Sequence, residues 1–216
     1  MSWNGARFGL TRRGFLRRGF GFSAMAPASA VAASAGDAAQ TLKPNQALPS
    51  LRPRVTPIPN EEYLARQEKA RELMAAARLD AVLLMGGSSL LYFTGVTWGR
   101  SERVFAAVLP RRGELACVCP AFERQRAEEQ IRFPDSTGAG GKDLRTWEED
   151  QSPYRLLRQV LRDRGVRRLG MEETLPYFVV AGLAREAPAI AQAPADPVTA
   201  GCRMVKSPRE IGRAHV

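Results

Sequence analysis

Apolar residues at helical spacing alternate along this chain with short runs in which every residue is apolar. Asn60 can cap the first helix, whose first turn holds Glu61 and Glu62, because carboxylates suit the exposed backbone amides at a helix start. The apolar stripe of this helix is made of Tyr63, Ala70, Leu73, Met74 and Ala77. Residues 81–85 are continuously apolar, which predicts a strand that is buried on both faces.

The later elements continue this alternation. Pro110-Arg111-Arg112-Gly113 separates two apolar runs and predicts a β-hairpin of residues 104–109 with 114–119. Ser152 and Pro153 open the best-defined helix, which Gly165 ends. Further helices are predicted at 88–93, 122–131 and 176–185, and further strands at 144–148, 168–172 and 189–193. This order predicts an α/β fold in which helices cover both faces of a mixed sheet.

Composition narrows the class of protein. The 216 residues are 44% hydrophobic, which is enough to build a core and excludes a mostly disordered chain. No stretch reaches the roughly 18 to 20 uncharged apolar residues of a spanning helix, so no stable membrane span is predicted. The single histidine, His215, and three cysteines exclude Ser-His-Asp triads, histidine-rich zinc sites and disulfide frameworks.

The positive charge is unevenly placed. Lys and Arg number 32 against 22 Asp and Glu, a formal net charge of +10. Five arginines that precede the first acidic residue, Asp37, make up half of that excess. A nucleic-acid partner would require basic residues clustered beside stacking aromatics on the folded part, and the sequence shows no such cluster. No nucleic-acid partner is therefore predicted.

The basic N-terminus resembles a twin-arginine export signal. Its characteristic residues are Arg12, Arg13, Phe15 and Leu16. An uncharged, mildly apolar stretch follows at 19–35 and ends in two A-x-A sites for a signal peptidase. A basic disordered tail would explain the arginines but neither the apolar stretch nor the A-x-A sites. Residues 1–35 are thus expected to be a signal peptide for the twin-arginine export machinery, which places the protein in the periplasm or outside the cell. The proline-rich stretch 36–60 is expected to be a linker.

Two glycine-containing segments resemble functional motifs but lack residues that those motifs require. Segment 136–142 resembles a phosphate-binding loop, but Ser136 replaces the first glycine and Asp143 replaces the magnesium-binding Ser or Thr. Gly86-Gly87-Ser88-Ser89 follows a strand as a nucleophile elbow does, but Leu90 replaces the last glycine and no histidine base is available. We predict a surface loop and a turn, respectively.

Two cysteines and two groups of adjacent carboxylates could also be read as chemical sites. Cys117 and Cys119 share one face of a predicted strand, as a metal or redox pair could, but isolated pairs of this kind are more often small buried hydrophobes. Glu172 and Glu173, like the acidic run 148–150, are adjacent and point to opposite sides of a strand. We therefore expect solvated strand ends rather than acid and base groups. No catalytic and no metal-ligating residue is predicted.

The loop at 92–103 offers candidates for recognition. Trp98, Arg100 and Arg103 lie between two buried elements, and loops are where recognition residues gather. In a packing interpretation, Trp98 instead covers the core and Glu102 pairs with an arginine. The sequence leaves both interpretations open.

Three features together resemble one family. They are Tyr92-Phe93-Thr94-Gly95 after the buried strand, the hairpin, and the stretch Arg203-Met204-Val205-Lys206-Ser207-Pro208-Arg209-Glu210. This combination is similar to the N-terminal domain of the creatinase/prolidase/aminopeptidase P family. The resemblance implies a creatinase/prolidase-type N-terminal domain at 61–200 and, at 201–210, the start of the junction to a catalytic domain.

In that family catalysis belongs to the second, pita-bread domain. That domain holds two divalent metal ions, Mn, Zn or Co, through two aspartates, one histidine and two glutamates, none of which can be matched here. The resemblance implies an inert fragment of a metallopeptidase whose substrate is a peptide with proline. It also implies roles for this domain in a homo-oligomer and in the wall of the substrate cleft, for which Trp98, Arg100 and Arg103 are candidates. The alternatives are the N-terminal domain of a creatinase-like C–N hydrolase, or a free-standing non-catalytic α/β binding domain.

The final residues have an unusual pattern. Residues 211–216 resemble the translation of a sequencing adapter, in which case His215 is not part of the protein. A genuine continuation is expected to start a helix after Pro208 and to lead into the next domain.

Overall fold

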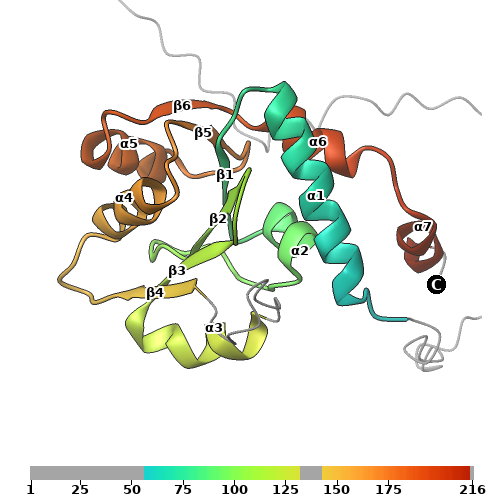
Figure 1. Cartoon of the computed structure of the whole chain (residues 1–216). Helices are drawn as coiled ribbons and strands as arrows, with labels where there is room; N and C mark the ends of the chain where they lie inside the picture. The colour runs from blue at the N-terminus through green and yellow to red at the C-terminus, as the bar shows by residue number, and fades with distance from the viewer. Residues whose placement is uncertain (1–55, 132–142, 215–216) are drawn as a thin grey trace, which may run out of the picture. The chain divides into compact units, whose positions relative to one another are not determined.

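The computed structural model describes residues 56–131 and 143–214. The predicted signal peptide, most of the predicted linker, the glycine-rich loop 136–142 and His215 lie outside the described residues. Within the described ranges the chain alternates helices and strands, as the apolar patterns predict (Figure 1). No helix in these ranges has both the length and the apolar character needed to cross a membrane.

The strands form one mixed sheet. They are β1 (Ala81–Met85), β2 (Ala106–Pro110), β3 (Ala116–Pro120), β4 (Asp143–Trp147), β5 (Arg168–Met171) and β6 (Ala191–Pro194). Their spatial order is β4-β3-β2-β1-β5-β6. β2 pairs antiparallel with β1 and β3, with Leu83 opposite Val108 in the β1–β2 ladder. The β3–β4, β1–β5 and β5–β6 pairs are parallel. The predicted mixed sheet and its hairpin are thus confirmed.

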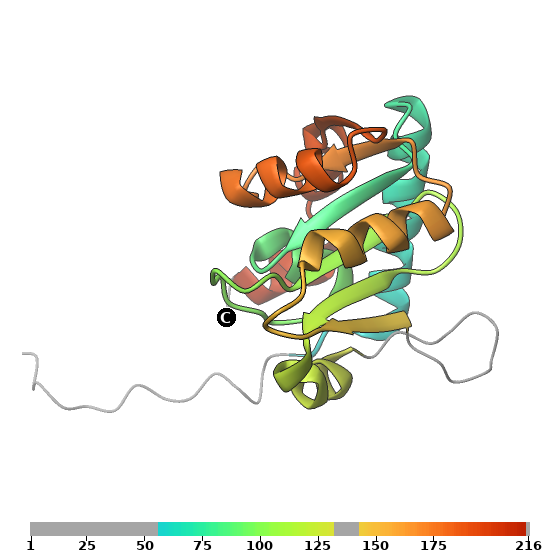
Figure 2. The ribbon, with the colours of Figure 1, turned by 90° about the vertical axis from the view of Figure 1, so that its left-hand side faces the viewer.

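Helices cover both faces of this sheet. They are α1 (Asn60–Ala76), α2 (Ser88–Thr94), α3 (Arg124–Gln130), α4 (Pro153–Asp163), α5 (Tyr177–Glu186), α6 (Asp196–Arg203) and α7 (Pro208–Ala214). A short 3-10 turn, Ala121–Glu123, precedes α3. In Figures 1 and 2, α4 and α5 lie on one side of the strands and α1, α2 and α6 on the other.

The pleat of β1 explains the two layers. Its five residues are all buried, and successive side chains of a strand point to opposite faces. Val82 and Leu84 join the core under α1, α2 and α6, where they pack with Met74, Phe93 and Val198. The other residues of β1 join a second core that contains side chains of α4 and α5. A strand buried on both faces must be apolar throughout, as this one is.

Local signals fix several element ends. Ser152 caps α4, where its hydroxyl accepts a hydrogen bond from the Arg155 amide at 3.4 Å, and Pro153 is the first residue of the helix. Gly95 ends α2 in the left-handed region at φ 72°, which glycine adopts without strain. One predicted cap is wrong: Asn60 is the first helical residue of α1, Pro59 precedes it, and no side chain caps this end.

One helix was not predicted. α6 begins with Asp196 and Pro197, a helix-start signal, and buries Val198, Thr199 and Cys202. It packs beside α1 so closely that a Cβ added to Gly201 would lie 3.1 Å from Leu73 Cδ1. Small residues hide the amphipathic pattern of this segment.

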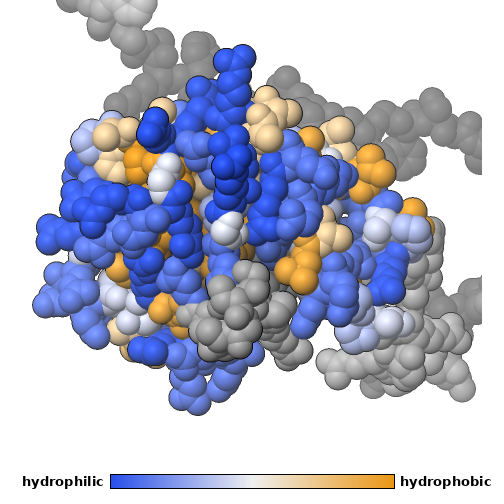
Figure 3. Space-filling view, in the orientation of Figure 1, coloured by the Kyte–Doolittle hydropathy of each residue, from blue (hydrophilic) through white to orange (hydrophobic). Residues whose placement is uncertain are grey.

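The surface in Figure 3 is mostly hydrophilic, with hydrophobic residues in separate patches.

Candidate functional site

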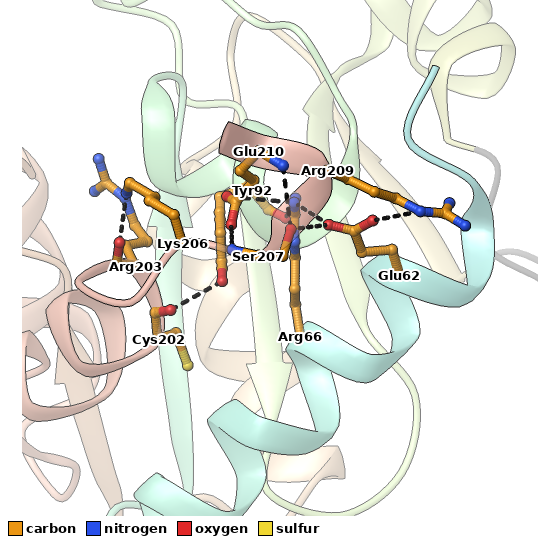
Figure 4. A network of polar contacts seen from close by, with 9 residues as sticks. All are labelled: Glu62, Arg66, Tyr92, Cys202, Arg203, Lys206, Ser207, Arg209 and Glu210. Carbon is orange, nitrogen blue, oxygen red and sulfur yellow. Dashed lines mark hydrogen bonds and ion pairs between the residues drawn. The ribbon is translucent and has the colours of Figure 1, made fainter. Parts of the chain in front are cut away.

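A buried arginine on α1, Arg66, lies at the centre of a network of polar contacts (Figure 4). We define the Arg66 network as Glu62, Arg66, Tyr92, Ser207 and Glu210. The Arg66 side chain is only 7% exposed. Its Nη2 lies 2.7 Å from Glu62 Oε1 and 3.3 Å from Glu210 Oε1. One guanidinium therefore joins a carboxylate of α1 to a carboxylate of α7.

The same arginine completes the end of α2. The last carbonyl groups of a helix lack partners within the helix. Arg66 Nη1 donates to the Tyr92 carbonyl at 3.0 Å, and Gln67 Nε2 donates to the Phe93 carbonyl at 2.9 Å. The Arg66 guanidinium also lies 4.2 Å from the centre of the Tyr92 ring, a cation–π contact. Adjacent residues of α1 thus explain why Tyr92-Phe93-Thr94-Gly95 ends a helix here.

Ser207 and Glu210 start α7 as a capping box. The Ser207 amide donates to Glu210 Oε2 at 2.8 Å, and the Glu210 amide donates to Ser207 Oγ at 3.2 Å. Pro208 occupies the first helical position, where its missing N–H costs nothing. Ser207 Oγ also lies 3.1 Å from Glu62 Oε1 and donates to it. The Ser-Pro-x-Glu part of the sequence motif is therefore a helix start that is bound to α1.

The first residue of that motif is bound elsewhere. Arg203 Nη1 donates to Ser89 Oγ at 3.1 Å, and Ser89 Oγ donates to Glu172 Oε1 at 3.1 Å. Thr174 Oγ1 lies 2.7 and 2.8 Å from the two Glu172 oxygens. Tyr92, whose ring lies against Arg66, also contacts the residue before this motif, because its hydroxyl donates to the Cys202 carbonyl at 3.0 Å (Figure 4). Burial is the main cause that raises the pKa of Tyr92.

The expectation of a solvated Glu172 is wrong. This residue is 4% exposed, whereas the adjacent Glu173 is exposed and accepts a hydrogen bond from Thr199 Oγ1 at 2.7 Å. Glu172 follows β5 directly and lies against the first turn of α2, where Ser89 meets it. A buried carboxylate needs hydrogen-bond donors, and the two hydroxyl groups supply them. Neither Arg66 nor Glu172 was recognised from the sequence, although Glu62 and Arg66 have the i, i+4 spacing of a helical ion pair.

The three predicted recognition residues have different neighbours. Trp98 is 7% exposed and stacks on Phe105 with ring centres 4.0 Å apart, while the Arg126 guanidinium lies 4.1 Å from the Trp98 ring centre. This matches the packing interpretation, in which Trp98 covers the core. Arg100 is exposed and donates from Nε to the Gly86 carbonyl at 3.0 Å.

Arg103 binds two carboxylates at the surface. Its side chain is 41% exposed and lies 2.7 Å from Glu102 and 2.8 Å from Glu149. The expected pairing of Glu102 with an arginine is therefore confirmed. The described contacts of Trp98, Arg100 and Arg103 are with three different segments. Their role in a substrate cleft or an interface stays a prediction.

The thiols are buried, as predicted. Cys117 and Cys119 lie in the core under α1, and burial is the main cause that raises the pKa of each to about 12. Both thiols therefore stay protonated near neutral pH and are poor nucleophiles and metal ligands. Across 56–131 and 143–214 no three His, Cys, Asp or Glu side chains are grouped so as to hold a metal ion. The described residues thus do not fit a dinuclear metal centre.

The similarity to known proteins covers the same part of the chain. A family model described as Creatinase/Prolidase N-terminal domain matches residues 66–205. An uncharacterized peptidase of Schizosaccharomyces pombe is 30% identical over 171 residues, which cover 71% of this chain and 35% of that protein.

Two solved structures share the fold. Dipeptidase PepE from Mycobacterium ulcerans aligns with a TM-score of 0.61 at 24% identity, over 72% of this chain and 40% of that chain. The creatinase/prolidase N-terminal domain of an X-Pro dipeptidase from Streptococcus pyogenes aligns with a TM-score of 0.52 at 17% identity, over 63% of this chain and 98% of that one. The present chain thus spans 35% of the curated relative and 40% of the PepE chain. Because the family model matches well over half of its residues, this chain belongs to the creatinase/prolidase N-terminal domain family, whose domain forms the N-terminal part of Xaa-Pro peptidases and prolidases.

Proposed function

We propose that this chain is the non-catalytic N-terminal domain of an exported Xaa-Pro metallopeptidase of the aminopeptidase P or prolidase type. The observation that supports this most directly is the way α7 begins. Ser207 and Glu210 start a new helix after the last helix of the α/β domain, and Glu62 and Arg66 bind that start from α1. Such an arrangement suits a chain that leaves a finished domain and enters another one.

The chemistry would then belong to the following domain. The described side chains do not group into a metal site, whereas the proposed activity requires metal-activated water. The chain spans only 35% of its curated peptidase relative, which leaves ample length in a homologous protein for a catalytic domain. We assign to the present domain the support of that second domain, contacts within a homo-oligomer, and part of the wall of the substrate cleft.

Two further parts of the proposal concern recognition and location. Arg100 and Arg103 are the candidates for contacts with a peptide substrate or a second subunit, because both are charged and present exposed surface. Trp98 would support them from the core, since it is nearly buried. Arg12 and Arg13 would direct export to the periplasm or beyond through the twin-arginine machinery.

The proposal is tested by comparing two proteins. One is the 216-residue chain, and the other is the product of the same gene locus with its downstream coding sequence. Each is supplied with Mn²⁺, Zn²⁺ or Co²⁺ and a proline dipeptide, and the released proline is measured. We expect hydrolysis by the longer protein alone. Hydrolysis by the 216-residue chain, or an in-frame stop directly after Glu210, would contradict the proposal. If the longer protein hydrolysed creatine and not the dipeptide, the parent protein would be a creatinase-like C–N hydrolase rather than a peptidase.

The export claim has its own test. Arg12 and Arg13 are both replaced by Lys in a fusion to a periplasmic reporter, because the export machinery recognises the arginine pair and not the charge alone. We expect the reporter to stay in the cytoplasm. Undiminished export of this variant would contradict the claim without touching the catalytic proposal.

A further inference from the structure

Helix α7 is held to the domain by polar contacts rather than by apolar packing. Neither of the two hydrophobic cores contains a residue of 208–211, the part of α7 whose side chains the structure describes. Ile211, a large apolar residue of α7, is 48% exposed. Met204 and Val205, which precede the helix, are 76% and 72% exposed. Apolar burial therefore contributes little to the position of this first turn of α7.

The segment that leads to α7 is bound at both ends. Arg203 anchors one end, because it donates to Ser89 and lies 3.9 Å from Glu173. Ser207 and Glu210 anchor the other end on α1. The three residues between these anchors are exposed, and the Lys206 ammonium turns back to the Arg203 carbonyl. The segment is thus a short exposed link between two bound points.

The second anchor is a shielded group of charges. The side chains of Arg66, Glu62 and Glu210 are 7%, 16% and 17% exposed, so solvent and salt screen their attraction less than at an open surface. Arg66 faces both carboxylates. The Ser207 hydroxyl donates to Glu62 Oε1, which Arg66 also binds, and the Ser207 amide donates to Glu210 Oε2. Arg209 Nε lies 3.9 Å from the other Glu62 oxygen. The planar fork of Arg66 reaches α2 and both carboxylates at once, which the single ammonium of a lysine would not do.

We propose that Arg66 is the shared residue of an ionic latch that holds the start of α7 against α1. The latch sets the direction in which the chain leaves the domain, and its release frees α7 while the α/β domain stays folded. That the segment being directed is a following catalytic domain rests on the proposed function. The latch itself concerns contacts within this chain alone.

Limited digestion with trypsin of the purified 216-residue chain tests the latch. Cleavage after Lys206, in the exposed link, is followed by mass spectrometry and compared with cleavage after Arg112, in the exposed hairpin turn. Arg66→Gln removes the shared cation. Glu210→Gln removes only the charge that faces Arg66, because glutamine can still serve in a capping box. Both variants should raise the ratio of Lys206 to Arg112 cleavage roughly 10- to 150-fold, the range expected from losing a hydrogen bond to a charged group.

Matched controls separate the latch from a general effect of charge. Arg124→Gln and Glu149→Gln make the same chemical changes in exposed ion pairs on other segments and should leave the ratio unchanged. An unchanged ratio in Glu210→Gln would overturn the proposal. So would equal acceleration at both sites in that variant, since this indicates opening of the whole domain. Circular dichroism of each variant verifies that the domain is folded. This readout does not depend on any enzymatic activity of the chain itself. A failure of the proposed function would therefore leave the result intact.

Discussion

Gly86, directly after β1, lies against the backbone of Gly99 with no room for a side chain. A Cβ added to Gly86 would lie 2.6 Å from the Gly99 carbonyl oxygen and 2.7 Å from that of Trp98. Backbone atoms cannot rotate away as a side chain can. We therefore expect Gly86→Ala to lower the free energy of unfolding by about 2–3 kcal/mol, as in overpacked cores.

Urea unfolding followed by circular dichroism measures this loss. Gly99→Ala is the matched control, because a Cβ added there would meet nothing within 4 Å. We expect the control to stay within about 0.5 kcal/mol of the wild type. Equal stability of the two variants would show that the loop after β1 does not approach as closely as described.

Trp98 should matter for stability whatever else it does. Its ring is 7% exposed and stacked on Phe105, so Trp98→Ala leaves a cavity and should cost about 3–5 kcal/mol. Phe122→Ala, at an aromatic that is 64% exposed, is the comparison and should cost much less. Thermal unfolding of both variants checks the difference. A stable Trp98→Ala protein would contradict the packing described for this residue.

We expect the Ser89 hydroxyl to contribute to the stability of the fold. Ser89→Ala removes a hydrogen bond to the buried Glu172 carboxylate and one from Arg203. Leaving a buried carboxylate short of a donor should cost about 1–3 kcal/mol. Thr97→Ala, at an exposed position, is the control. Chemical unfolding measures both, and an unchanged Ser89→Ala protein would mean that Thr174 alone satisfies Glu172.

The buried thiols predict a pH dependence of stability. Burial raises the pKa of Cys117 to about 12 from its ordinary value of 9.0. The unfolded thiol therefore ionises first, and this group's contribution is complete below pH 9.0 and is lost as the pH rises toward about 12. The loss amounts to about 1.4 kcal/mol per pH unit.

Urea unfolding between pH 8 and pH 11 measures this effect. Other groups ionise in that range, so the wild type is compared with Cys117→Ala at each pH. The variant should lose stability less steeply. Parallel curves for the two proteins would indicate that the Cys117 thiol is not held protonated. A thiol reagent should also label Cys117 slowly until the protein unfolds.

Much of the fold could be predicted from local patterns. The apolar run of β1 and the Ser152-Pro153 start of α4 are determined by residues close together in sequence, so both elements could be predicted from the sequence. α6 was missed because it is short and its buried face consists of Val198, Thr199 and Cys202, which form no long apolar stripe, and only its contact with α1 explains their burial. The predicted Asn60 cap was wrong by one residue. Pro59 occupies the capping position before α1, and this helix start has no side-chain cap.

The candidate site was far less predictable. Arg66 and Glu172 read as ordinary surface charges, because nothing near them in sequence reveals their burial. Ser207 meets Glu62 across 145 positions of the chain, a pairing that only the folded sheet produces. The capping box within the Ser-Pro-x-Glu motif could have been found from its spacing. What it is bound to could not.

The contact between α1 and α6 also constrains how the protein is made. The core on that side of the sheet contains Met74 from α1 together with Val198 and Cys202 from α6, and Figure 1 shows these two helices side by side. During translation the first helix leaves the ribosome long before its partner exists. The apolar stripe of α1 therefore cannot be fully buried until nearly the whole domain has been synthesised, and until then it is exposed or bound by a chaperone.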